Sequence, residues 1–190
     1  MKLIFASNNK NKIAEIQNLL AGVYEVLPME AIGCTVDIPE TADTIEGNAL
    51  LKAQYIWENY QIPCFADDSG LEVEHLNGAP GVHSARYGGL PKSDKKNTQK
   101  LLAALEGQEN RNANFKTVIA LIIGGETHLF EGKVFGKITE KPSGNQGFGY
   151  DPIFIPNGYT KTFAEFQMAE KSKISHRGLA VQQLVTFLKR

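Results

Sequence analysis

The sequence has few of the features that mark specialised classes of protein. It contains two cysteines, Cys34 and Cys64, without a paired-thiol spacing, so neither a zinc ribbon nor a disulfide framework is indicated. Basic and acidic residues nearly balance, with a formal net charge of -1 and a pI near 6.4. Binding to a phosphate backbone or an anionic membrane needs clustered Lys and Arg. We therefore expect no nucleic-acid partner and no membrane partner.

Long apolar runs are also absent. The N-terminus, MKLIFASNNK, reaches polar residues within a few positions, which is too short for a secretory signal peptide, and no run approaches membrane-spanning length. We expect a soluble protein in a reducing, cytoplasmic setting. With 190 residues and no evident linker, the chain fits a single domain, 1–190, with one substantial core or two lobes that share a cleft.

The most distinctive stretch, residues 67–89, reads DDSGLEVEHLNGAPGVHSARYGG. The apolar run before it, residues 62–66, predicts a buried strand that carries Asp67 and Asp68 to its exposed tip. Neighbouring carboxylates repel one another, and a shared divalent cation or a raised pKa that makes one of them a general base relieves the repulsion. An acidic turn after a strand is an equally good explanation of these residues.

A second polar stretch lies near the N-terminus. Residues 2–6 predict a strand, and the loop SNNKNK at residues 7–12 follows it before Ile13, Ile16 and Leu20 take up helical spacing. A helix N-terminus directs free N–H groups outward, so this loop suits phosphate oxygens. A capped and solvated helix start is the simpler alternative, because Asn and Ser are ordinary capping residues.

The rest of the chain alternates between helical and strand patterns. The spacing predicts helices after a Thr44 cap, over 94–105 and after a Ser175 cap. Tyr24 to Leu27 predicts a further strand, and Gly124-Gly125 predicts a two-residue turn between antiparallel strands over 115–123 and 126–138.

Two C-terminal features indicate a ligand. In the loop KPSGNQGFGYDP, Phe148 and Tyr150 stand among glycines, with Asp151 next to a proline. An aromatic ring beside a carboxylate can stack on a purine and accept hydrogen bonds from its edge. Packing of the ring on the core is the alternative. Lys171 and Arg177 are poorly placed for helix stability, because a positive charge near the start of a helix interacts unfavourably with the helix dipole. They are well placed to hold an anion.

Four segments together resemble one known family. SNNKNK, ADDSGLEV with GAPGVHSARYGG, FGYDPIF and EKSKISHRG are similar in order and spacing to the motifs of the inosine triphosphate pyrophosphatase (Ham1-like) family. The resemblance spans nearly the whole chain. It implies an α/β fold with a mixed, elongated central sheet and flanking helices, two lobes around a cleft, and a homodimer. It also implies that a nucleoside triphosphate such as ITP, dITP or XTP is hydrolysed to monophosphate and pyrophosphate, with Mg²⁺ as cofactor, in a housecleaning role.

The resemblance also implies residue roles, motif by motif. The triphosphate would be bound by Ser7, Asn8, Asn9, Lys10, Asn11 and Lys12, and magnesium would be held by Glu40 and Asp68. Asp68 matches the general base, with Asp67 as its acidic neighbour and Ser69 as a substrate contact. The nucleotide pocket would be completed by Phe148, Gly149, Tyr150, Asp151, Lys171, His176 and Arg177.

The chain departs from the family pattern at two positions. It has Asn8 where the family often has Gly, and Gly47 where the family often has an acidic residue. The second departure displaces Glu46 by one position, so Glu40 is the safer metal ligand.

Three other readings compete with this one. A Maf-like pyrophosphatase would use the same chemistry with different base contacts, and FGYD argues against it. A haloacid-dehalogenase-like phosphatase needs Asp-x-Asp, whereas Asp67 and Asp68 are adjacent. A nucleotide sensor without turnover has little use for a general base. The sequence leaves open which aspartate takes the proton and how ITP, XTP and their deoxy forms rank.

Overall fold

The computed structural model describes residues 2–189, which form two compact units. Unit 1 contains the described residues up to Asp68, Thr117–Gly132, and those from Arg177 on; unit 2 contains Ser69–Lys116 and Lys133–His176. The chain therefore passes from one unit to the other four times. The single domain predicted for residues 1–190, and the cleft between two lobes, stay predictions.

A mixed six-stranded sheet runs in the order β2-β1-β3-β4-β5-β6. Its strands are β1 (Lys2–Phe5), β2 (Glu25–Pro28), β3 (Cys64–Val73), β4 (Asn112–Ile123), β5 (Glu126–Ile138) and β6 (Phe154–Pro156). β1 pairs in parallel with β2 and with β3, whereas β5 and β6 are antiparallel. With its flanking helices, this sheet confirms the predicted α/β fold class.

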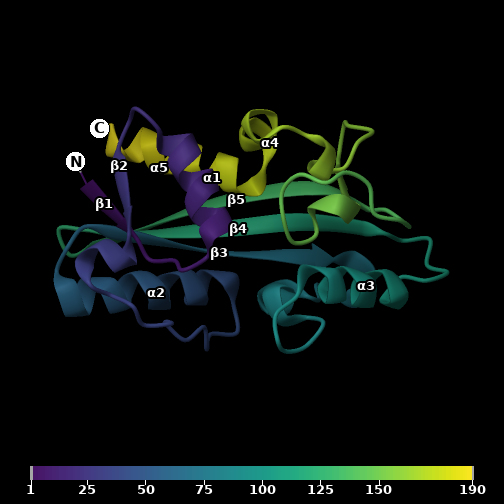
Figure 1. The fold of residues 1–190 in the computed structure, drawn as a ribbon, viewed down its shortest axis with the longest axis horizontal. Coiled ribbons are helices and arrows are strands. Elements are labelled where there is room, and N and C mark those ends of the chain that lie inside the picture. Colours follow the sequence, from purple (N-terminus) through teal and green to yellow (C-terminus); the bar gives the residue numbers. More distant parts are fainter. Residues whose placement is uncertain (1, 190) are drawn as a thin grey trace. The chain divides into compact units, whose positions relative to one another are not determined.

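In unit 1, helices cover both faces of the strands. Figure 1 shows α1 (Lys10–Leu20) and the C-terminal α5 (His176–Leu188) on one face, and α2 (Ile45–Tyr60) on the other. The apolar spacing of α1 places Ile16 and Leu20 in a buried cluster with Phe5 and Phe65, whose rings stack with centroids 4.9 Å apart. Complete burial of one such side chain stabilises the fold by about 1.5–3 kcal/mol, so this cluster holds the helices on the strands.

Unit 2 has its own core. Leu101 and Leu105, at the end of α3 (Asp94–Ala104), join a buried cluster with Phe115 and Phe154, whose ring centroids lie 4.7 Å apart. Figure 1 shows α3 on one face of these strands and the short α4 (Met168–Ile174) on the other. Each unit thus buries a separate apolar cluster.

Most of the predicted elements are confirmed. Thr44 caps α2, because its hydroxyl accepts a hydrogen bond from the Gly47 N–H at 3.0 Å. Gly124 and Gly125, both with positive φ, join β4 to β5 as the hairpin signal predicted. The last helix begins at His176, directly after Ser175.

One prediction about the acidic stretch is wrong. Asp67 and Asp68 do not lie at the exposed tip of a strand: β3 continues to Val73, and the two aspartates are 0% and 6% exposed. The strand continues because Leu71 and Val73 are buried in the unit 2 core, so alternate residues beyond the aspartates still gain from burial.

Both cysteines, Cys34 and Cys64, are buried and form no disulfide. Burial raises the pKa of the Cys64 thiol to about 12, so it is an unreactive core residue. Within residues 2–189, no helix combines the length and the apolar character that crossing a membrane requires.

Candidate active site

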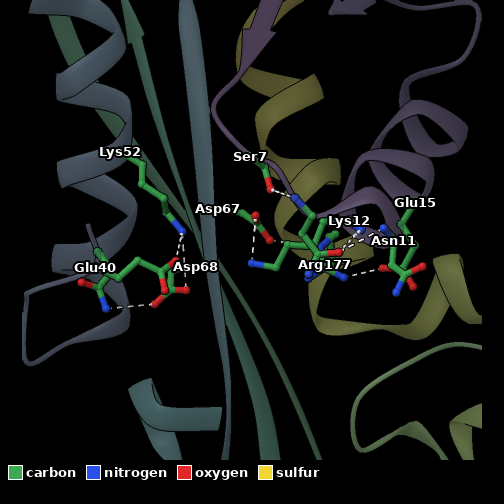
Figure 2. Close-up of polar contacts among 11 residues, drawn as sticks. Ser7, Asn11, Lys12, Glu15, Glu40, Lys52, Asp67, Asp68 and Arg177 are labelled. Atoms are coloured by element: carbon green, nitrogen blue, oxygen red, sulfur yellow. Dashed lines mark hydrogen bonds and ion pairs between the residues drawn. The ribbon is translucent and has the colours of Figure 1, made fainter. Parts of the chain in front are cut away.

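The candidate active site of unit 1 is built around two aspartates in the middle of β3. Successive side chains of a strand point to opposite faces, and Figure 2 shows Asp67 turned toward Lys12 and Arg177 and Asp68 turned toward Lys52. Adjacent in the sequence, the two carboxylates have different neighbours. Relief of their repulsion by a shared divalent cation stays a prediction, and the pKa of Asp68, the second alternative, is raised.

Asp67 is held by two cations from opposite ends of the chain. Lys12 Nζ lies 3.1 Å from Asp67 Oδ1, and Arg177 Nε donates to Asp67 Oδ2 at 3.1 Å. Arg177 Nη1 also donates to Glu15, one turn along α1 from Lys12. Burial by itself would raise the pKa of Asp67, but Lys12, Arg177 and Lys52 together hold that pKa well below its usual range. Asp67 is thus a firmly ionised anchor for the basic groups.

Asp68 lies among groups from α2 and from the loop that precedes it. Lys52 Nζ is 2.7 Å from Glu40 Oε1 and 3.7 Å from Asp68 Oδ1, and Asn48 Nδ2 donates to Asp68 Oδ2 at 3.4 Å. Burial raises the pKa of Asp68, Glu40 and Asp67 add to the rise, and Lys12 and Lys52 oppose it. Asp68 therefore accepts a proton more readily than Asp67 does.

The two carboxylates assigned to magnesium face a common cation. The Lys52 ammonium lies between Glu40 and Asp68, and these acids raise its pKa although burial works to lower it. Within residues 2–189, no three His, Cys, Asp or Glu side chains are grouped as metal ligands. Mg²⁺ commonly takes only one or two carboxylates, with water and substrate phosphates as its other ligands. The residues present are therefore compatible with Mg²⁺, because the Glu40 and Asp68 carboxylates already face one cation, the Lys52 ammonium.

Glu46 is exposed on the first turn of α2. At the next position, a Cβ on Gly47 would lie 2.6 Å from the Cβ of Ala42. A side chain at this position would therefore require the neighbouring Ala42 to shift.

Three residues of this site were missed by sequence reasoning: Glu15, Asn48 and Lys52. Lys52 could have been found, because it falls within the buried stripe formed by Ala49, Ala53 and Ile56 on α2. A lysine in such a stripe needs an ionic partner, since burial of an unpaired charge is costly. Glu15 carries a weaker signal, as an acidic residue one turn after Lys12 on the side of α1 that packs on the sheet.

In the N-terminal polar loop, several backbone N–H groups donate hydrogen bonds to side chains of the same loop. Asn9 caps α1 by accepting from the N–H groups of Asn11 and Lys12 at 3.0 and 3.2 Å, and Ser7 Oγ accepts from the Asn9 N–H at 3.2 Å. Asn8 donates to a backbone carbonyl at 3.3 Å. Asn8, Asn9, Lys10 and Asn11 are exposed. The capping alternative is correct for Asn9, and phosphate binding by this loop stays a prediction.

Unit 2 brings together a second group of predicted residues. Asp151 Oδ2 accepts from Lys171 Nζ at 2.7 Å and from the Phe148 N–H at 2.9 Å. Lys171 Nζ also lies 5.2 Å from the centroid of the Phe148 ring, within range of a cation–π contact. A Cβ on Gly147 would lie 2.0 Å from Asp151 Oδ2, so only glycine allows this turn. The FGYD loop and Lys171 therefore lie close together in unit 2, and their role in a nucleotide pocket stays a prediction.

Other predicted residues of unit 2 are mainly buried. Tyr150 is 4% exposed and its hydroxyl donates to the Ser84 carbonyl at 2.8 Å, so core packing is correct for this ring. The His176 ring stacks on Phe115 with centroids 4.6 Å apart. Ser69 is half-buried in β3, directly after Asp68. Phe148 is half-buried and is the aromatic residue of the loop that retains exposed surface.

Together these observations define an α/β protein with a carboxylate-centred ionic cluster in unit 1 and an aromatic–carboxylate loop in unit 2. The chain belongs to the Ham1 family, whose model matches residues 3–187. The curated protein "dITP/XTP pyrophosphatase" from Flavobacterium psychrophilum is 57% identical over 189 residues, which is 100% of both chains. The protein of the same name from Porphyromonas gingivalis is 55% identical over 98% of this chain and 97% of its own.

Solved structures show the same relationship. The Staphylococcus aureus Ham1 protein matches with a TM-score of 0.90 and 40% identity, over 100% of this chain and 98% of its own. A HAM1 protein from Coxiella burnetii matches with a TM-score of 0.91, 40% identity and the same coverage.

Proposed function

We propose that this protein is a nucleoside-triphosphate pyrophosphatase that hydrolyses ITP, dITP and XTP to the monophosphate and pyrophosphate. Its full-length relatives carry the name "dITP/XTP pyrophosphatase". The observation that carries the proposal is the environment of Asp68, a buried carboxylate of raised pKa beside the Lys52–Glu40 ion pair. A pure binding protein gains nothing from a carboxylate tuned toward proton uptake.

The cations of unit 1 would bind the triphosphate. Lys12 and Arg177 are both oriented by Asp67, so their positions are set before the substrate arrives. Lys52 supplies a third positive charge on the side of Asp68. The other residues proposed to contact phosphate are in the N-terminal loop: Ser7, Asn8, Asn9, Lys10 and Asn11. Three fixed cations offset the charge repulsion that a nucleophile meets when it approaches a polyanion.

Asp68 is the proposed general base. It takes a proton from the water that attacks the α-phosphorus, and pyrophosphate leaves with the bond electrons. Burial and Glu40 favour the protonated form of Asp68, whereas Asp67 is held ionised by Lys12 and Arg177. The aspartate with the higher pKa is the better proton acceptor, and a general base contributes about 10²–10⁴-fold to the rate.

Glu40 and Asp68 are the residues that would hold Mg²⁺. When bound, Mg²⁺ supplies positive charge that neutralises phosphate oxygens in the transition state. Both carboxylates already face one ammonium group, Lys52 Nζ, which supports their assignment to a common cation.

The residues of unit 2 would recognise the base. The Phe148 ring would stack on the purine, Asp151 would accept hydrogen bonds from its edge, and Lys171 would contribute a donor beside Asp151. The other proposed contacts are Ser69, Gly149, Tyr150 and His176. A donor aimed at the purine six-position suits a keto oxygen, whereas the amino group of adenine would leave that donor unpaired. This difference supports a preference for hypoxanthine and xanthine over adenine.

Release of pyrophosphate from ITP, XTP, dITP, ATP, GTP and UTP, with and without Mg²⁺, tests the proposal. We expect Mg²⁺-dependent release from ITP, XTP and dITP at rates well above the rate with ATP. Equal rates on all purine nucleotides would refute the specificity, and tight binding without turnover would indicate a sensor. The variant Asp37→Asn, at an exposed aspartate, is the matched control and should behave as the unmodified chain does.

The homodimer and the cytoplasmic, nucleotide-pool role are further parts of this proposal, and they rest on the family resemblance. Light scattering at working concentration measures the oligomeric state. A monomer mass would exclude the dimer without affecting the proposed chemistry.

A further inference from the structure

An aspartate outside the family motifs contacts the FGYD loop. Asp94 is the first residue of α3, and its Oδ2 accepts from the Gly149 N–H at 2.8 Å. The two residues are 55 positions apart in the chain and belong to the same unit. A carboxylate is a strong acceptor for a backbone N–H, so this contact ties the loop to the start of a helix.

The contact holds one edge of a peptide group whose other edge is also held. The Phe148 carbonyl accepts from the Asp151 N–H at 3.2 Å. Because a peptide group is planar and trans, the Phe148 carbonyl and the Gly149 N–H point in opposite directions within the same plane. Asp94 and the Asp151 N–H therefore hold the peptide group between Phe148 and Gly149 by hydrogen bonds at its two opposite edges.

The helix that carries Asp94, α3, is itself held by hydrogen bonds to residues 85–88. Asn97, on the next turn of α3, accepts from the Gly88 N–H at 2.6 Å and donates to the Ala85 carbonyl at 3.1 Å. The same segment, at Ser84, accepts the hydroxyl of Tyr150 at 2.8 Å. The helix start and the loop thus share one framework, and a contact built on a helix orients its partner more precisely than a contact between loops.

We propose that Asp94 is a positioning residue for base selectivity. By fixing the Phe148–Gly149 peptide, it keeps the Phe148 ring and the Asp151 carboxylate in the relative positions that recognition of a purine requires. The inference rests on the proposed function, which assigns those two residues to the base. The competing explanation is that Asp94 only stabilises α3, since an acidic residue in the first turn complements the helix dipole.

Three variants separate these explanations. Asp94→Ala removes the acceptor, and Asp94→Asn keeps an acceptor oxygen without the charge. Ser93→Ala removes the cap of α3, in which Ser93 Oγ accepts from the Lys96 N–H at 3.3 Å, and it leaves the contact between Asp94 and Gly149 in place. Each variant is measured for kcat/KM with ITP and with ATP, and for amide hydrogen exchange of the peptide that covers residues 147–151.

We expect Asp94→Ala to raise exchange in that peptide and to lower the ITP-to-ATP ratio of kcat/KM about tenfold, the low end of the cost of losing a hydrogen bond to a charged group. Asp94→Asn should recover most of both effects. Ser93→Ala should leave the ratio and the exchange of the loop unchanged, although it weakens α3.

Unchanged exchange in Asp94→Ala, or equal effects of Asp94→Ala and Ser93→Ala, would overturn the proposal. Faster exchange with an unchanged ratio would overturn the role in selectivity. If the unmodified enzyme does not prefer ITP over ATP, the proposed function is refuted, and so is the role of Asp94 in base selectivity. The exchange measurement then still decides whether Asp94 holds the loop.

Discussion

Asp67 and Asp68 are the same residue type at consecutive positions of one strand, yet they have opposite electrostatic environments. Asp67 contacts Lys12 and Arg177, which hold its pKa low in spite of complete burial. Asp68 contacts Lys52 and Asn48, and burial together with Glu40 raises its pKa. The alternation of a strand sends one carboxylate to the side of α1 and α5 and the other to the side of α2.

This difference shows how a fold assigns separate tasks to identical groups. A carboxylate with two close cations remains ionised and orients them, so it suits binding of an anion. A buried carboxylate with less compensation takes up a proton more easily, so it suits general-base catalysis. The neighbours, and not the type of residue, decide which task each aspartate can perform.

The largest expected effect is on catalysis, from Asp68→Asn. Asparagine has nearly the same shape but cannot take the proton, so kcat with ITP and Mg²⁺ should fall by about 10²–10⁴-fold. The urea midpoint should change little, because burial already disfavours the charge at Asp68. Pyrophosphate release and urea unfolding measure the two quantities. A kcat within about threefold of the unmodified enzyme would remove Asp68 from the role of base.

The next effect is on stability, from Asp67→Asn. The change leaves Lys12 and Arg177 buried without their shared carboxylate, and loss of one partner of a buried ion pair costs about 3–5 kcal/mol. The free energy of unfolding by urea measures it. Asp37→Asn, at an exposed position, is the control and should change stability by no more than about 0.5 kcal/mol. Equal effects at the two positions would contradict the anchoring role of Asp67.

Stability should also depend on pH with the sign set by Asp67. Because its folded pKa lies below that of the unfolded chain, near 3.9, Asp67 stabilises fully above about pH 5. This stabilisation begins to decrease once the pH falls below about 4, and it keeps decreasing toward the lower folded pKa at up to about 1.4 kcal/mol per pH unit. Urea unfolding in metal-free buffer between pH 7 and 3 should show a shallower acid loss for Asp67→Asn than for the unmodified chain. Parallel curves would disprove this contribution.

The smallest effect is expected at an exposed ion pair of the same unit. Lys2 and Glu25 face each other across β1 and β2 at 3.5 Å, and both side chains are more than half exposed. Exposed pairs contribute about 0–1 kcal/mol, so Lys2→Ala should barely shift the urea midpoint. A loss of stability as large as that of Asp67→Asn would mean that burial is not the reason why the Asp67 ion pairs contribute strongly to stability.

The regular elements could be predicted from the sequence because they follow local rules. Ile13, Ile16 and Leu20 mark the buried face of α1, Thr44 caps α2, and the Gly124-Gly125 pair joins β4 to β5. Helical spacing, capping and turn chemistry each act within a few residues. Such features need no knowledge of the rest of the fold.

The acidic stretch could not be predicted in the same way. DDSG is typical of a turn, but tertiary contacts keep it in the middle of β3, where cations from α1, α2 and α5 compensate its charges. The motifs indicated Lys12, Arg177 and Lys171 as parts of a site. They did not indicate that Lys52 lies between Glu40 and Asp68, because that placement depends on how α2 packs against the strand.

The most direct test is a carbon-13 titration of the aspartate carboxyl groups in metal-free buffer, assigned with Asp67→Asn and Asp68→Asn. We predict that Asp68 takes up its proton at a pH above that of an ordinary aspartate, while Asp67 remains ionised well below that pH. The reverse order, or two coincident titrations, would contradict the division of tasks between the two faces of β3.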